Sequence, residues 1–171
     1  FRHPYLHTGD TAEKKAVLRS FLEERGYTIA PVTIDNDEWL FARAYARALQ
    51  QGKDNLVLDE IRTAYVEWME QVIAHFEAWS VEVVGYEVPQ ILLLHANQLN
   101  ASAFGDIAAI FGRRGYRFVT LEEALADPAY NRSDTYVTEW GVSWLHRWAR
   151  SMDMEIQWEP DAPAWIVELG D

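Results

Sequence analysis

His95 is the residue of this chain whose position most strongly suggests chemistry. It ends the apolar run 91–94, which follows Pro89. Successive aliphatic residues are typical of a strand buried on both faces, as in a parallel sheet covered by helices. Ligands meet the carboxyl ends of such strands, and an imidazole there could transfer protons near neutral pH. A histidine that is simply hydrogen-bonded at the edge of the core would produce the same pattern.

Two other segments hold side chains suited to acid–base chemistry. The turn 35–39 reads Asp-Asn-Asp-Glu-Trp, and the segment 2–5 reads Arg-His-Pro-Tyr. Carboxylates, histidine and tyrosine are the usual groups that transfer protons in enzymes. Structural explanations stay open for both segments, because the acidic turn can cap a helix, Arg2 can be a frayed terminal residue, and Trp39 can simply pack.

The elements expected around these residues alternate between helices and strands. Apolar periodicity, caps and stops predict a helix that begins at a cap, Asp10 or Thr11, and ends at Gly26. They predict further helices over 39–51, 58–79, 103–114, 121–126 and 136–150. Apolar and β-rich runs predict strands over 27–34, 90–95, 116–119 and 155–158. Such alternation predicts an α/β protein with a parallel sheet or barrel. This topology would bring 2–5, 35–39 and His95 to one rim.

Composition limits the classes of partner. Lys and Arg number 15 against 27 Asp and Glu, so the formal charge is -12 and the chain lacks the positive charge that nucleic acids and anionic membranes attract. We therefore expect neither as a partner. The chain has no Cys, so a metal would have to be held by His and carboxylates. No apolar run approaches the roughly 20 residues that span a bilayer.

Four segments, in this order, resemble motifs of the polysaccharide deacetylases, metal-dependent enzymes that remove acetyl groups from N-acetylated sugars. Arg2-His-Pro-Tyr5 is similar to the Arg-x-Pro-Tyr motif, and Ala30-Pro-Val-Thr-Ile-Asp-Asn-Asp-Glu-Trp39 resembles the strand that delivers an acidic turn and a Trp to the active site. Leu92-Leu-Leu-His95 is similar to the Leu-x-Leu-His strand end, and 118–125 resembles the strand and helix that follow. The likeness covers roughly residues 1–127.

The resemblance implies a fold and a location. It implies a distorted (β/α) barrel, of which residues 1–171 form the C-terminal portion as a single domain. Residues 128–171 would be a helical extension rich in Trp, outside the comparison. It also favours a periplasmic or extracellular location.

The resemblance further implies catalytic roles. His95 would protonate the departing amine. Arg2 would pair with a carboxylate near the catalytic base and hold it ionised, and Asp35 or Asp37 would be that partner.

The substrate side of the implied site involves two more residues. The backbone N–H of Tyr5 would help to hold the tetrahedral oxyanion, and Trp39 would form a wall of the pocket. The implied partner is an acetylated carbohydrate.

Several family features are missing. The Asp-Asp and His-x-x-x-His motifs, which supply the base and the metal ligands, do not occur before Arg2. His3 and His7 have the four-residue spacing, but Pro4 makes a shared helical face improbable. Glu38 also stands where Asp is common. We therefore expect no cofactor in this chain, although a complete site of the family would hold zinc or another divalent metal.

Two consequences follow for activity and assembly. The chain should be inactive alone, and a non-catalytic carbohydrate-binding or interaction module is the alternative function. An incomplete barrel would leave a strand edge open, which predicts a homodimer or strand exchange through that edge.

Overall fold

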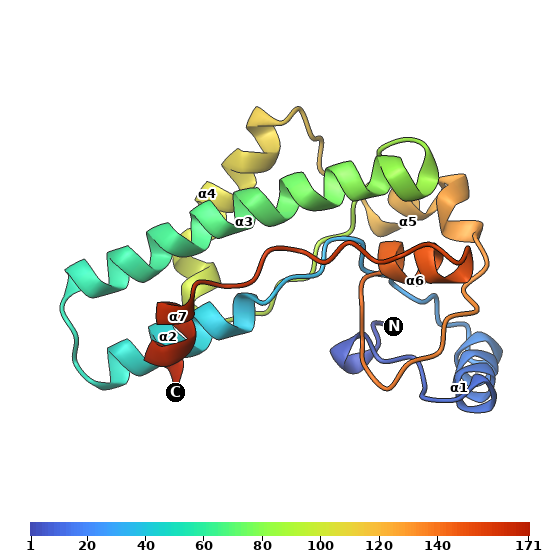
Figure 1. Ribbon diagram of the computed structural model, residues 1–171, viewed down its shortest axis with the longest axis horizontal. Coiled ribbons are helices and arrows are strands. Elements are labelled where there is room, and N and C mark those ends of the chain that lie inside the picture. The colour runs from blue at the N-terminus through green and yellow to red at the C-terminus, as the bar shows by residue number, and fades with distance from the viewer. The chain divides into compact units, whose positions relative to one another are not determined.

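The computed structural model describes residues 1–171, and its regular structure is almost entirely helical (Figure 1). None of the helices combines the length and the apolar character needed to cross a membrane. The elements in chain order are η1 (Pro4–Leu6), α1 (Ala12–Glu24), α2 (Glu38–Gln50), α3 (Asn55–Val84), α4 (Gln98–Arg113), α5 (Leu121–Leu125), η2 (Pro128–Asn131), α6 (Trp144–Ser151) and α7 (Ala164–Gly170).

The predicted (β/α) barrel is wrong, and so is the α/β fold class. One parallel β-bridge forms, between Ile34 and Leu92, and there is no sheet. The predicted strands 27–34 and 90–95 make only this bridge, and 116–119 and 155–158 form no strand. The predicted dimerisation or strand exchange required an open sheet edge, and the structure has no sheet to provide one.

Backbone hydrogen bonding explains why the apolar runs do not pair as strands. The carbonyl of Ile91 accepts from two successive amides, those of Thr33 at 2.9 Å and Ile34 at 3.2 Å. The Ile91 amide donates to the Thr33 hydroxyl at 2.7 Å, and the Ser143 hydroxyl donates to the Thr33 carbonyl at 2.7 Å. Side chains thus occupy backbone groups that a ladder would need. The apolar pattern indicated burial, and Ile34 is indeed buried, but it did not determine the pairing.

Local capping signals are confirmed. The Thr11 hydroxyl accepts from a backbone amide at the start of α1, and Thr120 and Glu123 form a capping box at the start of α5, the helix expected over 121–126. The helix predicted over 136–150 is shorter than expected, because α6 begins only after Ser143, whose hydroxyl accepts from a backbone amide of its first turn.

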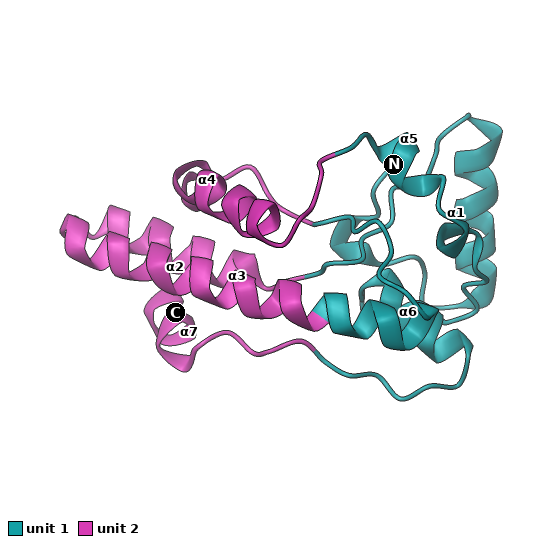
Figure 2. Ribbon diagram, turned by 90° about the horizontal axis from the view of Figure 1, so that it is seen from above, with its two compact units in different colours: residues 1–35, 76–92, 119–158 teal, residues 36–75, 93–118, 159–171 magenta.

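The contacts divide the chain into two compact units (Figure 2). Unit 1 comprises residues 1–35, 76–92 and 119–158, and unit 2 comprises residues 36–75, 93–118 and 159–171. In unit 2, α2 packs against both α4 and α7. The ring of Phe41 on α2 lies 5.5 Å from that of Tyr65 and 4.9 Å from that of Trp68, both on α3.

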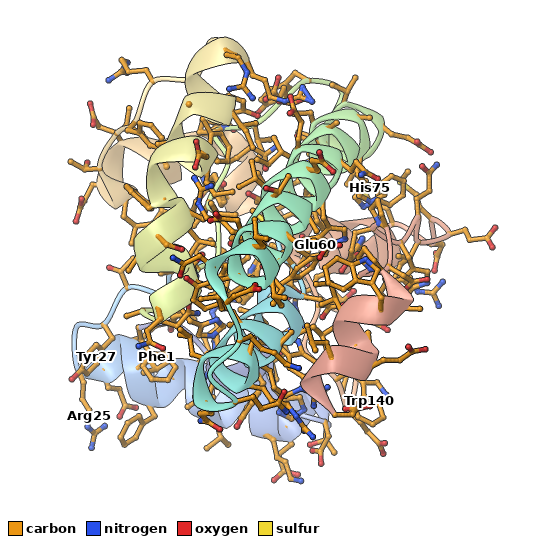
Figure 3. All side chains as sticks on the ribbon, turned by 90° about the vertical axis from the view of Figure 1, so that its left-hand side faces the viewer. Phe1, Arg25, Tyr27, Glu60, His75 and Trp140 are labelled. Carbon is orange, nitrogen blue, oxygen red and sulfur yellow. The ribbon has the colours of Figure 1, made fainter.

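In unit 1 the first residue is tied to the segment after α1. The ammonium group of Phe1 donates to the Thr28 carbonyl at 2.5 Å, and the Phe1 carbonyl accepts from the Ala30 amide at 2.7 Å. The rings of Phe1 and Tyr27 meet edge to face at 6.5 Å, and Figure 3 shows them side by side. Arg2 therefore follows an anchored residue, which argues against a frayed end.

Candidate functional site

Unit 2 holds a buried carboxylate directly behind an exposed histidine. Glu38 is the first residue of α2, and its side chain is only 1% exposed, whereas the side chain of His95 is 58% exposed. Glu38 Oε1 lies 2.7 Å from His95 Nδ1. A buried carboxylate is tolerated only where its oxygens are hydrogen-bonded, so the remaining partners of Glu38 matter.

Two asparagines at the start of α4 supply those partners. Asn97 caps α4, and its Nδ2 donates to Glu38 Oε2 at 3.1 Å and more weakly to Oε1 at 3.4 Å. Asn100, one turn later, donates from Nδ2 to Glu38 Oε2 and also to the His95 carbonyl, the latter at 2.9 Å. The carboxylate is therefore surrounded by neutral donors and by one imidazole.

A buried tyrosine orients the second asparagine. Tyr65 on α3 donates its hydroxyl to Asn100 Oδ1 at 2.7 Å. This bond identifies Oδ1 as the acceptor end of the amide, so Nδ2 must face Glu38. Burial and the nearby charge of Glu38 raise the pKa of Tyr65 well above its ordinary value, so the phenol remains a donor. The residues Tyr65, Asn100, Glu38 and His95 thus form one continuous network.

The start of α2 places the carboxylate. The Glu38 amide donates to Asn36 Oδ1 at 3.0 Å, and Asn36 Nδ2 donates to the Leu93 carbonyl at 2.8 Å. Asn36 therefore connects the first turn of α2 to the segment that carries His95, and fixes the separation between the two groups.

This arrangement can perform directed proton transfer. A carboxylate at Nδ1 favours the tautomer that carries its proton there, which leaves Nε2 as the nitrogen that exchanges protons with a ligand. An open groove lies beside the imidazole, and its lining includes Asn97, Gln98 and the exposed ring of Phe104. A substrate in this groove could reach His95 without displacing the core.

Two other predicted site residues belong to unit 2. Asp37 occupies the N-cap position of α2 but makes no side-chain cap, and it accepts a hydrogen bond from Trp39 Nε1 at 3.1 Å. Trp39 is 50% exposed, and the Arg43 guanidinium lies 5.4 Å from its ring centroid. The structure thus brings Asp37 and Trp39 together, whereas the acid that contacts His95 is Glu38.

The remaining predicted residues, Arg2, Tyr5 and Asp35, belong to unit 1. Arg2 is half-buried, burial lowers its pKa, and its Nε is buried without a hydrogen-bond partner. The expected pairing with Asp35 does not form within unit 1. Tyr5 is 94% exposed and has a positive φ of 53° within η1, so its side chain lies in solvent.

Metal ligands do not gather within either unit alone. His75 and Glu159 belong to unit 2 and His146 to unit 1, so neither unit by itself holds three converging ligand side chains. In unit 1, His146 Nε2 lies 3.1 Å from the Gln157 carbonyl. Neither unit alone provides a ligand set for the divalent metal that the resemblance implies.

Comparison with known proteins adds no further constraint, because no family model, curated protein or solved structure matches the chain.

Sequence reasoning missed Glu38, Asn97, Asn100 and Tyr65 as members of a site. The sequence places Glu38 in the acidic turn 35–39 and marks it as a departure from a motif, but it does not single this residue out as the partner of His95. Asn97 and Asn100 have the i, i+3 spacing that puts two side chains on one helical face, which is the only local signal that could have indicated them.

Proposed function

We propose that this chain supplies the proton-delivery side of a carbohydrate N-deacetylase site. His95 is the acid that protonates the departing amine, and Glu38 is the carboxylate that orients it. One observation carries the proposal: the exposed imidazole has its Nδ1 2.7 Å from a carboxylate that is almost fully buried.

Amide hydrolysis needs such a group because an amine leaves readily only after its nitrogen has gained a proton. With Nδ1 engaged by Glu38, the imidazolium can release only the Nε2 proton toward a substrate in the groove. The resemblance of 2–5, 30–39, 92–95 and 118–125 to deacetylase motifs supports an acetylated amino sugar as the substrate class. The water-activating side of the reaction is not assigned to any residue of this chain.

The test is reconstitution. The chain is mixed with an N-terminal segment that carries the Asp-Asp and His-x-x-x-His motifs, a divalent metal is added, and acetate release from N-acetylglucosamine oligomers is measured. We expect release from the mixture and none from the chain alone. His95→Gln should lower the rate by about 10²–10⁴-fold, the range for a lost general acid.

A matched control separates chemistry from a general loss of charge. Glu38→Gln should lower the rate, whereas Glu122→Gln, which removes an exposed acid in α5, should leave it unchanged. Equal rates for wild type and His95→Gln would contradict the proposal.

A non-catalytic carbohydrate-binding module is the second candidate. Exposed tryptophans favour it, since flat indole rings at a surface suit stacking on sugar rings; these are Trp39, Trp140, Trp158 and Trp165. Binding of the oligomer without acetate release in the reconstituted mixture would favour this candidate over the enzyme.

A further inference from the structure

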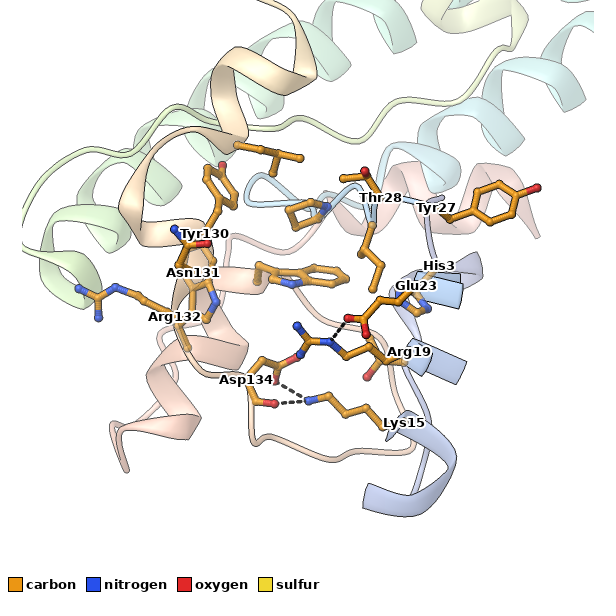
Figure 4. Close-up of a pocket in the computed structure, with 16 residues that line it drawn as sticks. His3, Lys15, Arg19, Glu23, Tyr27, Thr28, Tyr130, Asn131, Arg132 and Asp134 are labelled. Carbon is orange, nitrogen blue, oxygen red and sulfur yellow. Dashed lines mark hydrogen bonds and ion pairs between the residues drawn. The ribbon is translucent and has the colours of Figure 1, made fainter. Parts of the chain in front are cut away.

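Unit 1 contains a cavity of about 350 Å³ that is separate from the His95 groove in its lining residues (Figure 4). Aromatic rings form part of its lining, namely Tyr27, Tyr130, Trp144 and Trp148. Tyr130 and Trp148 meet edge to face with centroids 5.5 Å apart, so these walls are firmly packed. The volume lies at the lower end of the range for small-molecule sites.

The charges beside this cavity are unbalanced. Asp134 is shared by two cations: its Oδ1 lies 2.8 Å from Lys15 Nζ and its Oδ2 lies 2.8 Å from Arg147 Nε. The side chains of Lys15, Asp134 and Arg147 are 16%, 14% and 0% exposed, so this trio holds one excess positive charge out of water. Neutral oxygens solvate the two cations: Lys15 Nζ donates to the Tyr136 carbonyl at 3.1 Å, and Arg147 Nη2 donates to the Thr8 hydroxyl at 2.7 Å. None of these partners supplies the missing negative charge, and a buried charge without a counter-charge is costly.

A second cation on the cavity lining also lacks an acidic partner. Arg132 donates to the Val84 carbonyl at 3.2 Å and to Met152 Sδ at 3.5 Å, and both acceptors are neutral. Arg19, in contrast, is neutralised by Glu23 at 2.9 Å, as Figure 4 shows. The neighbourhood is therefore positive in a chain whose formal net charge is -12.

Two buried nitrogens near the trio have no hydrogen-bond partner. They are Arg147 Nη1 and Nδ1 of His3, a residue that lines the cavity and is only 5% exposed. Burial, followed by the charge of Arg147, lowers the pKa of His3, so its imidazole is neutral and does not add to the excess charge. Unsatisfied buried groups are rare in folded proteins and often indicate a missing partner.

We propose that this cavity binds a small monocarboxylate that carries a ring of monosaccharide size. The carboxylate would neutralise the excess charge of Lys15 and Arg132 on the lining and of Arg147, which lies behind the lining residue Asp134. Hydrogen bonds between a carboxylate and a cationic donor are stronger than those between neutral groups. The ring would lie against Trp144 and Trp148. This inference does not rest on the proposed function, because it involves none of the residues of the His95 network.

Three probes test the contributions of the ring and of the carboxylate to binding. Glucuronate carries ring and carboxylate, glucose has the ring alone, and acetate has the carboxylate alone. The 171-residue chain is labelled with ¹⁵N and titrated with each probe at low ionic strength while indole and backbone signals are followed. We expect glucuronate to shift the Trp144 and Trp148 indole signals and to bind at least tenfold tighter than either fragment.

Variants test the charge directly. Arg147→Met would remove one of the two cations that hold the buried Asp134 and would disturb folding. Arg132→Gln is therefore the informative change, with retention of the wild-type spectrum as its folding check. It should weaken glucuronate binding about tenfold, the lower end for a charge-assisted hydrogen bond. Arg113→Gln, at an exposed arginine of α4 in unit 2, is the control and should have no effect.

Several outcomes would overturn the proposal. Glucose or acetate binding as tightly as glucuronate would remove the ring–carboxylate requirement. Shifts confined to unit 2, or an equal affinity in Arg132→Gln, would show that the cavity is not the site. A glucuronate affinity that does not fall as salt is raised would also contradict a charge-based site.

Discussion

Replacing Glu38 by glutamine should reverse the tautomer of His95, and this result can be worked out from the hydrogen bonds. In the wild type, Oε2 accepts from Asn97 at 3.1 Å and from Asn100, while Oε1 faces His95 Nδ1 at 2.7 Å. A glutamine has one oxygen and one NH₂ group. The two amide donors require its oxygen at the Oε2 position, so the NH₂ group must face Nδ1.

The size of the tautomer preference follows from the change in the group that faces His95 Nδ1. In the wild type Nδ1 must donate to a carboxylate, and a hydrogen bond to a charged group contributes about 1.5–3 kcal/mol. Since His95 is 58% exposed, the lower value applies, and it corresponds to about a tenfold preference for the Nδ1–H tautomer. In Glu38→Gln, Nδ1 must accept, so the proton moves to Nε2.

The assay is NMR of the imidazole nitrogens with ¹⁵N-labelled histidine, at a pH where the ring is neutral. The shifts of Nδ1 and Nε2 should exchange their order between wild type and Glu38→Gln, and Glu122→Gln should match the wild type. If wild-type His95 carries its proton on Nε2, or if the variant leaves the order unchanged, then the carboxylate does not control this histidine and the reasoning fails.

Three further changes test other parts of the structure. Tyr65→Phe leaves Asn100 Oδ1 buried without its donor and should lower the free energy of unfolding by about 1–2 kcal/mol, measured by urea denaturation. The pKa of His3 in the folded state lies below its unfolded value of about 6.5, so the unfolded state binds the proton first as the pH falls. The free energy of unfolding should therefore decrease as the pH drops from about 7 toward 5. His3→Gln should make this decrease smaller, as measured by urea titrations at several pH values. Gly141→Ala places a methyl group into the carbonyl oxygen of Tyr5 and should lower the thermal unfolding midpoint, because the backbone must move to relieve the overlap. An unchanged midpoint in Gly141→Ala would mean that this close approach is not maintained in solution.

Local signals predicted α1 to α5, placed α6 too early, missed α7 and failed for the strands. Thr11 and Thr120 act within their own first turns, so the residues that decide the outcome are adjacent in sequence. The pairing of Ile34 with Leu92 is decided instead by Thr33 and by Ser143, which lies 110 residues from Thr33. An apolar run indicates burial, but it does not indicate which groups will take its amides and carbonyls.

The candidate site could likewise be predicted only in part from the sequence. His95 could be singled out from its position at the end of an apolar run, because that pattern is local. The role of Glu38 depends on Asn97 and Asn100, which lie 59 and 62 residues later in the chain. From sequence alone, an acid at the start of a helix is explained by favourable interaction with the helix dipole. That explanation is sufficient, so nothing in the local pattern requires a buried carboxylate.

The types of residue that hold Glu38 are informative about what the carboxylate can do. An arginine or lysine at Asn97 or Asn100 would also satisfy its oxygens, but it would cancel the charge. The amides donate hydrogen bonds while remaining neutral, so the negative charge is stabilised without being neutralised. The only partner that can become a cation in this network is His95, and it is also the most exposed member. The buried carboxylate therefore acts on the one group of this network that can exchange a proton with a ligand, through the exposed side of its ring.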